Sequence, residues 1–209
     1  MVDGFWTWVA AALIGYFFGA LPTAYLLVRF FTSKNVMDWG TGNVGTLNVH
    51  RATNSKVLTL LTLLGDMLKA ALAIIVGYYL ARGAGLEVDT GATVGGIAAI
   101  AGHNYSVFLR FKGGKGLSCS ASIGFYFSPI IAGLWISAFL ATVLVSRWLV
   151  LGQIVATATL PVICYFLVPE AAVASYLVTA LVLLRHTPRI RNLIEGTEPK
   201  LYYKLQRSR

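Results

Sequence analysis

The sequence predicts an all-α membrane protein that crosses the bilayer seven times, with its N-terminus outside and its C-terminus in the cytoplasm. Of the 209 residues, 57% are hydrophobic and only 12% are charged, whereas about a quarter of the residues of a soluble domain carry a charge. The apolar residues gather in runs near the roughly 20 residues that a spanning helix needs. The basic residues lie in alternate connections between these runs.

Five apolar runs are long enough, or nearly so, to span a membrane, and a sixth is weaker and rich in glycine. The five runs cover residues 4–28, 57–81, 116–146, 148–168 and 171–184, and the sixth covers 92–109. The first run does not have the pattern of a signal peptide, because no basic residue precedes it and Arg29 follows it. We therefore expect it to remain in the protein as a span.

The run 116–146 is long for one crossing and short for two. Ser128 and Pro129 divide it, and proline is favoured in the first turn of a helix. Two short helices that meet at this point bring the number of crossings to seven. With seven crossings, Arg147 and the basic C-terminal tail return to the side of the other basic loops.

The formal net charge is +9, and its placement indicates which side of the membrane each loop occupies. By the positive-inside rule the segments rich in lysine and arginine are cytoplasmic. Their basic residues are Arg29, Lys34, Arg51 and Lys56 in the first loop, Arg110, Lys112 and Lys115 in the second, and Arg185, Arg189, Arg191, Lys200, Lys204, Arg207 and Arg209 in the tail. A nucleic-acid-binding protein would not distribute charge in this way, so we expect no nucleic acid partner.

Three polar segments, residues 32–56, 103–122 and 185–199, face the cytoplasm in this topology and are called polar islands below. The first contains Gly40-Thr41-Gly42-Asn43-Val44-Gly45, which fits the G-x-G-x-x-G pattern of dinucleotide-binding proteins. No strand is expected before these glycines, and the context excludes that interpretation. The glycine amides can still converge on an anion, with Thr41, Asn43 and Asn48 as uncharged donors and Arg51 as a guanidinium for phosphate. The alternative is a connecting loop whose glycines form turns.

The second polar island places Lys112-Gly113-Gly114-Lys115-Gly116 directly before an expected helix. Backbone amides at a helix start and two lysines favour anion binding, although the lysines could instead extend along the membrane towards lipid headgroups. His103 lies at the end of the preceding apolar run, where it is either a hydrogen-bonded interfacial residue or a base.

Two charged residues lie inside the run 57–81. Asp66 and Lys69 are spaced i, i+3 and therefore share a helix face, about 15 Å from the cytoplasmic end at 1.5 Å per residue. Charges at this depth are usually paired. We expect a structural ion pair, with direct contact to substrate as the alternative.

The third polar island offers Arg185, His186, Arg189, Arg191 and Asn192. These residues either contribute to the same anion site or simply hold anionic lipid. The three islands contain no metal-ligand cluster, no Ser-His-Asp set and no paired carboxylates, and Cys119 and Cys164 lie inside apolar runs. We expect no metal, no cofactor and no disulfide framework, and a phosphate-bearing ligand.

Four segments together resemble a known family. The segments "GTGNVGTLNVHR", "GDMLKA", "AGHNYSVFLRFKGGKGLS" and the "RH" of the tail are similar, in order and spacing, to the motifs of the bacterial acyl-phosphate:glycerol-3-phosphate acyltransferases. The resemblance covers nearly the whole chain. It implies one integral membrane acyltransferase-like domain over 1–209, with a basic cytoplasmic tail from 185 to 209, in the inner membrane of a bacterial cell.

The resemblance implies transfer of an acyl group from acyl phosphate to the 1-hydroxyl of glycerol 3-phosphate, giving lysophosphatidate and phosphate for phospholipid biosynthesis. Partners would be these two substrates, membrane lipids and the soluble enzyme that supplies acyl phosphate. No protein general base is implied, because substrate phosphate takes the proton. Lys115, Arg51 and His186 would stabilise charge. The residues implied to bind substrate are Gly40, Thr41, Gly42, Asn43, Gly45, Asn48, Arg51, His103, Lys112, Gly113, Gly114, Lys115, Gly116 and Arg189.

Several positions depart from the family pattern. Leu47 stands where the family has threonine, Val150 and Gln153 stand where it often has serine, and Arg189 stands where it has asparagine. Two alternatives therefore stay open. One is a non-catalytic or re-specialised paralogue that binds a lipid phosphate or another phosphorylated ligand. The other is a transporter for a phosphorylated solute, which requires polar residues along several spans.

Overall fold

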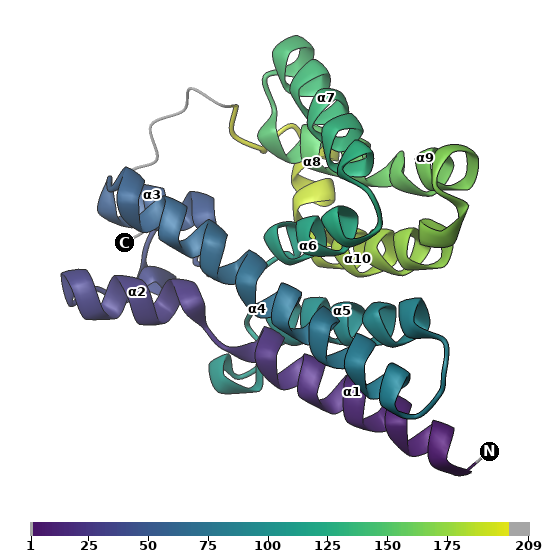
Figure 1. Cartoon of the computed structure of the whole chain (residues 1–209). Helices are drawn as coiled ribbons and strands as arrows, with labels where there is room; N and C mark the ends of the chain where they lie inside the picture. The colour runs from purple at the N-terminus through teal and green to yellow at the C-terminus, as the bar shows by residue number, and fades with distance from the viewer. Residues whose placement is uncertain (1, 201–209) are drawn as a thin grey trace. The chain divides into compact units, whose positions relative to one another are not determined.

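The computed structural model describes residues 2–200, with side chains from Gly4 onward, and all regular structure in this range is helical. The described chain forms two compact units, one ending at Ile123 and the other beginning at Gly124. Each is considered by itself below (Figure 1). The basic residues Lys204, Arg207 and Arg209 of the predicted tail lie outside the described residues.

Five segments of the described chain are long and apolar enough to cross a membrane: Gly4–Thr32, Lys56–Gly83, Pro129–Ser146, Leu149–Leu167 and Pro169–Ile194. Two further helices, α5 (Val88–Asn104) and α6 (Leu117–Phe127), are shorter, with 17 and 11 residues. The described part of the chain is therefore all-helical and rich in candidate spans. Seven crossings and the orientation of the termini remain predictions.

The first unit is built on three helices packed side by side, α1 (Val2–Ala20), α4 (Lys56–Gly83) and α5 (Figure 1). Their contacts use small residues, as in many membrane helix pairs. A side chain on Gly19 of α1 would overlap the backbone carbonyl of Ala99 of α5, and one on Gly77 of α4 would overlap that of Gly91. The glycine-rich composition of the sixth apolar run thus serves helix packing, and α5 begins and ends several residues before the predicted limits of 92 and 109.

The predicted first span, 4–28, is interrupted at Pro22, and the chain continues as α2 (Thr23–Thr32). Proline lacks a backbone N–H and its ring conflicts with a continuous helix. Two backbone carbonyls at this break accept hydrogen bonds from side chains elsewhere in the first unit. Ser106 Oγ donates to the Ala20 carbonyl at 2.6 Å, and Lys69 Nζ donates to the Leu21 carbonyl at 2.8 Å.

The first polar island is folded on a small core of its own. It contains the end of α2, the short 3₁₀ helix η1 (Val36–Asp38), a loop and α3 (Thr46–Thr53). The buried residues of this core are Ala24, Val28, Val36, Val44, Val49, Ala52, Leu58 and Leu109. The island is therefore a packed structure and not a plain connection, and Leu109 joins it to the second polar island.

The predicted break at Pro129 is confirmed. Helix α6 ends at Phe127, and α7 (Pro129–Ser146) begins with Pro129 in its first turn. The Ser128 side chain accepts a hydrogen bond from the amide of Ile130 at 3.3 Å and caps the new helix.

The second unit contains α7, α8 (Leu149–Ala158), α9 (Leu160–Leu167), the 3₁₀ helix η3 (Pro169–Ala171) and α10 (Ala172–Ile194). The predicted span 148–168 is found as Leu149–Leu167. It is divided into two helices, because Pro161 in the first turn of α9 has no backbone N–H to donate to the carbonyl of Thr157. That carbonyl accepts from Thr179 Oγ1 of α10 at 3.0 Å instead. The predicted limit of 171–184 is too short, since α10 continues ten residues into the third polar island.

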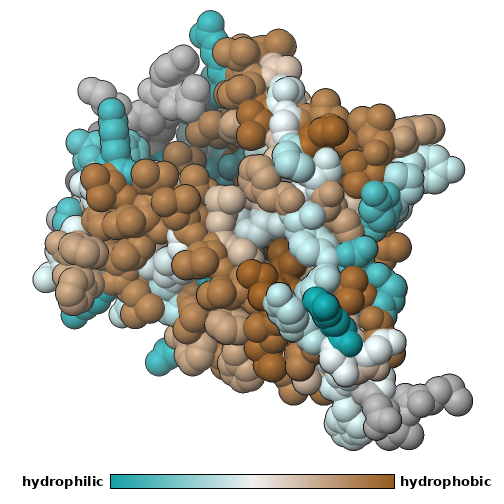
Figure 2. All heavy atoms as spheres, in the orientation of Figure 1, coloured by the Kyte–Doolittle hydropathy of each residue, from teal (hydrophilic) through white to brown (hydrophobic). Residues whose placement is uncertain are grey.

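Large apolar side chains are exposed on many helices, including Phe30, Leu144, Val145 and Phe166. Figure 2 shows that apolar residues cover much of the visible face. Exposed apolar patches of this extent are unusual for soluble proteins, and they suit side chains that contact lipid.

Candidate functional site

Asn48 organises the glycine loop of the first polar island. Its side chain is buried; the Oδ1 atom accepts from the backbone amide of Thr41 at 3.1 Å, and the Nδ2 group donates to the Val36 carbonyl at 3.0 Å. The amide of Gly42 donates to the Trp39 carbonyl at 2.9 Å. Two of the amides expected to surround a phosphate are therefore used within the loop, and Asn48 holds the loop together.

Gly40 allows Arg51 to lie over this loop. Gly40 has a φ of +57°, which disfavours other residues, and a side chain there would overlap the Asn48 amide. The Cδ atom of Arg51 is 3.3 Å from the position of that missing side chain. Arg51 lies on α3, i+3 from Asn48, and is half-buried, so its guanidinium is carried on the same structure that fixes the glycine loop.

His103 holds the glycine loop of the second polar island in place. It lies at the end of α5 and is buried, and its carbonyl accepts from the amide of Gly114 at 2.8 Å. A side chain on Gly113 would overlap the His103 carbonyl, and one on Gly114 would overlap its imidazole. Lys112 is exposed and Lys115 is half-buried. The glycines thus hold the loop against His103, and the Lys112 side chain is exposed to solvent.

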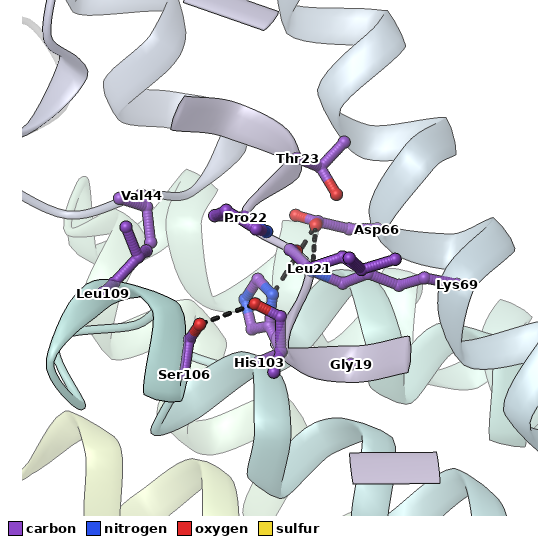
Figure 3. A pocket seen from close by; sticks show the side chains of 11 residues that line it. Gly19, Leu21, Pro22, Thr23, Val44, Asp66, Lys69, His103, Ser106 and Leu109 are labelled. Atoms are coloured by element: carbon purple, nitrogen blue, oxygen red, sulfur yellow. Dashed lines mark hydrogen bonds and ion pairs between the residues drawn. The ribbon is translucent and has the colours of Figure 1, made fainter. Parts of the chain in front are cut away.

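The two polar islands of the first unit meet at a small cavity beside the Pro22 break. Figure 3 shows Val44 of the first island beside Leu109 of the second at this cavity. Asp66, Lys69, His103 and Ser106 also line it. The remaining lining residues are Gly19, Ala20, Leu21, Pro22 and Thr23.

Asp66 and Lys69 form the ion pair that their spacing predicts. Lys69 Nζ lies 2.8 Å from Asp66 Oδ1, and His103 Nδ1 lies 3.5 Å from the same oxygen (Figure 3). Asp66 is 1% exposed and Lys69 5%. Because Lys69 also donates to the Leu21 carbonyl, the pair joins α4 to the broken end of α1.

The sequence suggested no metal-ligand cluster, but the fold brings together side chains that could form one. Ligand atoms of Asp66, His103 and Cys119 lie within 4.8 Å of one another. The ammonium of Lys69 already neutralises the carboxylate, however, and would repel a divalent cation. The Cys119 thiol points to the backbone carbonyl of Asp66 at 3.3 Å. These residues therefore fit a metal ion poorly, and both cysteines are free thiols.

His186 in the second unit is fully buried on α10. Its Nδ1 atom lies 2.8 Å from the carbonyl of Val182 and its Nε2 atom lies 3.2 Å from Oε1 of Gln153 on α8. Both ring nitrogens thus have partners that fix the orientation of the ring. Gln153, which the sequence marked only as a departure from the family, is the side chain that holds the histidine.

Arg189, one turn further along α10, pairs with Glu198 at 2.6 Å. Glu198 belongs to the segment after α10, is 6% exposed and was not among the predicted site residues. Its backbone amide donates to the Asn192 carbonyl at 3.1 Å, and its carbonyl accepts from Trp148 Nε1 at 3.2 Å. No spacing or motif in the sequence indicates this pair, because the two residues meet only when the chain turns back after Ile194.

The predicted site residues fall into two groups within their units. Asn48, His103, Gly40, Gly113 and Gly114 are buried or tightly enclosed and shape the loops. Two more are buried, Gly116 just before α6 and His186 in α10. The others are exposed or partly exposed: Thr41, Gly42, Asn43, Gly45, Arg51, Lys112, Lys115 and Arg189. Gly116 has a φ of +82° and lies against the Asn104 amide.

The chain is similar to known proteins over nearly its whole length. A family model described as glycerol-3-phosphate acyltransferase matches residues 9–196. A glycerol-3-phosphate acyltransferase of Trichlorobacter lovleyi is 35% identical, over 92% of this chain and 95% of the relative. One of Pseudomonas putida is 37% identical, over 90% of this chain and 96% of the relative.

Two solved structures are also similar to this chain over nearly its whole length. The crystal structure of PlsY (YgiH), an integral membrane glycerol 3-phosphate acyltransferase, in its glycerol 3-phosphate form matches with a TM-score of 0.80 and 26% identity, over 92% of this chain and 94% of that chain. Its lysophosphatidic acid form matches with a TM-score of 0.79. Together with the glycine loops described above, these likenesses show that the chain belongs to the glycerol-3-phosphate acyltransferase family of integral membrane proteins.

Proposed function

We propose that this protein transfers an acyl group from acyl phosphate to the 1-hydroxyl of glycerol 3-phosphate, giving lysophosphatidate and inorganic phosphate. The observation that carries the proposal is the pair of glycine-rich loops in the first unit. The first loop is fixed by the buried side chain of Asn48 and the second by the backbone carbonyl of His103, and each carries an incompletely buried cation, Arg51 or Lys115. Two rigid loops with cations suit two phosphate-bearing substrates.

The reaction needs positioning and charge stabilisation more than a strong base. The hydroxyl oxygen attacks the acyl carbonyl carbon, a new C–O bond forms, and the C–O bond to phosphate breaks. The hydroxyl proton passes to a phosphate oxygen of the substrates, so no protein general base is required. Lys115 and Arg51 would stabilise the negative charge that develops on the carbonyl and phosphate oxygens. Thr41, Asn43 and Lys112 are further proposed substrate contacts.

We place this activity in the inner membrane of a bacterial cell, in phospholipid biosynthesis. The apolar spans keep the protein where its lipid product belongs, and the basic polar islands suit cytoplasmic, phosphorylated substrates. A soluble enzyme would supply acyl phosphate. Asp66 and Lys69 are given a structural role, since they bond to each other and to the Leu21 carbonyl.

The test is phosphate release by the purified protein from acyl phosphate, with and without glycerol 3-phosphate. We expect phosphate release that depends on the acceptor, and no formation of lysophosphatidate when acyl-coenzyme A replaces acyl phosphate. Lys115→Ala is the catalytic control, and Lys56→Ala, which removes an exposed lysine at the start of α4, is the matched control that retains activity. Release no greater than that of Lys115→Ala would instead favour a non-catalytic paralogue that binds a lipid phosphate.

A further inference from the structure

The second polar island exposes two aromatic rings and a cation just before its glycine loop. Phe108 is 56% exposed and Phe111 is 60% exposed, and Arg110 between them is exposed as well. Residues 107–111 are called the aromatic–basic loop below. None of its exposed side chains is among the proposed substrate contacts, so the proposed reaction leaves their exposure unexplained.

The backbone of this loop adopts an unusual conformation where it presents the second ring. Arg110 has a φ of +52° and Phe111 a φ of +62°. A left-handed residue is common at the end of a helix, and Arg110 ends the 3₁₀ helix η2 (Val107–Leu109). A bulky side chain such as that of Phe111 rarely continues this conformation, because it costs free energy. Such a cost at an exposed aromatic residue indicates that the ring has a function outside the packed core.

Contacts within the first unit hold the loop in this conformation. Ser106 Oγ donates to the Ala20 carbonyl at 2.6 Å, and the Ser106 carbonyl accepts from the amide of Phe111 at 2.8 Å. Leu109 lies in the buried core of the first polar island, and its carbonyl accepts from the amide of Lys112 at 3.0 Å. The loop is therefore attached to the protein through Ser106 and Leu109, while its two aromatic rings stay outside.

The chemistry of the loop matches the headgroup layer of a membrane that contains anionic lipid. The loop directly follows α5, which packs against α1 and α4 of two candidate spans. Irregular backbone is not stable in lipid-exposed hydrocarbon, so the headgroup layer is the depth that suits it. Aromatic rings enter this layer readily. Residues 103–122 contain three basic residues and no acidic one, so the charge of the island favours an anionic surface.

We propose that the aromatic–basic loop is an interfacial anchor, whose two phenylalanine rings enter the headgroup layer and whose arginine binds an anionic lipid headgroup. The anchor is independent of the proposed reaction, because it uses none of the proposed substrate contacts. Its position has a consequence for the neighbouring segment. The glycine loop begins two residues after Phe111, at Gly113, and the anchor therefore holds that end of the glycine loop at the membrane surface.

The first test measures the depth of position 111 by electron paramagnetic resonance. The full-length protein carries Phe111→Cys with a nitroxide label, in vesicles of phosphatidylcholine alone or mixed equally with phosphatidylglycerol. Cys119 and Cys164 are buried, and the unsubstituted protein treated with the same label gives their background. We expect lipid-soluble oxygen to relax the label more strongly than a water-soluble nickel chelate does. Asp38→Cys, on an exposed residue of η1, is the aqueous control, and Ile136→Cys, on an exposed residue of α7, is the hydrocarbon control.

The second test changes the charge and the rings separately. One basic residue near an anionic surface corresponds to an about fivefold change in binding. Arg110→Gln should therefore lower the ratio of inserted to free label about fivefold in the mixed vesicles and little in phosphatidylcholine. Phe108→Ser should lower this ratio at least about tenfold in both vesicles. The matched controls are Arg82→Gln at the end of α4 and Phe30→Ser on α2, which are equally exposed residue types elsewhere and should leave the ratio unchanged.

Three results would overturn the proposal. A label at position 111 that is as accessible to nickel as the label at position 38 would place the loop in water. Lipid contact that responds neither to phosphatidylglycerol nor to Arg110→Gln would show that the loop does not recognise charge. A spectrum that changes on addition of acyl phosphate, but not with phosphatidylglycerol, would make the loop a surface for the acyl chain of the substrate. Lipid contact that increases with phosphatidylglycerol and falls with Arg110→Gln, but not with Arg82→Gln, is the result that supports the anchor.

Discussion

The Asp66–Lys69 ion pair is the feature whose loss should destabilise the protein most clearly. The two changes are Asp66→Asn and Lys69→Met, which keep nearly the same side-chain volume and remove one charge each. Separately, each leaves the other charge buried in the first unit. Together they remove both charges and leave a nearly uncharged contact.

The magnitude follows from the distance and the burial. At 2.8 Å and an effective dielectric constant near 20, the attraction is about 6 kcal/mol. Desolvation of the two ions opposes it by several kcal/mol each, so the net value of the intact pair is small. Loss of one partner strands the other, and such changes cost about 3–5 kcal/mol. Lys69→Met should be the milder of the two, because Asp66 keeps His103 at 3.5 Å.

The assay is a double-mutant cycle on the free energy of unfolding, measured by titration with sodium dodecyl sulfate in mixed micelles. We expect each single variant to lose about 3–5 kcal/mol and the double variant to lose at least about 1.5 kcal/mol less than their sum. Additive losses, or single variants as stable as the wild type, would show that the two side chains do not share an ion pair. Acceptor-dependent phosphate release by a folded Lys69→Met variant tests the structural role, because a substrate contact would lose activity without losing stability.

Three further predictions concern other parts of the chain. Gly114→Ala should lower acceptor-dependent phosphate release at least about tenfold, because the new methyl group would displace the His103 imidazole, whereas Gly133→Ala, with open space around it in α7, should keep full activity in the same assay. Lys115→Met should lower kcat/KM about 100-fold, or about 2.7 kcal/mol, and a value within a factor of three of the wild type would contradict a charge-stabilising role. The Glu87 carboxylate caps α5 by accepting hydrogen bonds from Thr90 and from the Asp89 amide, and these bonds lower its pKa below 4.5. The folded protein therefore binds fewer protons at this carboxylate than the unfolded chain does. The stability that the cap contributes is present above the unfolded-state pKa and is lost as the pH falls below about 4.5. Melting temperatures should show a slightly steeper acid loss for the wild type than for Glu87→Gln.

Local signals in the sequence were sufficient for several elements. Proline after serine inside a run too long for one crossing predicted the break at Pro129, since both residues act within one helical turn. The spacing of Asp66 and Lys69 predicted their pairing, because i, i+3 residues meet in any helix. The glycine motifs predicted the two loops of the first unit.

Contacts between distant segments could not be predicted in this way. Asn48 was expected to bind substrate, but its hydrogen bond to the Val36 carbonyl depends on how α2 and η1 place that carbonyl. Gln153 and His186 are 33 residues apart and meet because α8 packs on α10. Glu198 pairs with Arg189 only because the chain turns back after α10. In each case tertiary packing decides the partner, and no spacing rule along one helix identifies it.

The polar side chains within the spans decide between an enzyme and a transporter for a phosphorylated solute. A transporter would direct such side chains towards a solute path, but here several of them bond to backbone carbonyls. Lys69 and Ser106 donate hydrogen bonds to carbonyls at the Pro22 break. Thr179 donates to the carbonyl of Thr157, which Pro161 cannot bond. Ser122 Oγ likewise donates to the Met67 carbonyl at 2.8 Å. Because unsatisfied backbone groups are costly inside a bilayer, these residues stabilise broken and closely packed helices. Arg51 lies on α3 beside the first glycine loop, and Lys115 lies in the second glycine loop just before α6, so neither belongs to these helix-packing contacts.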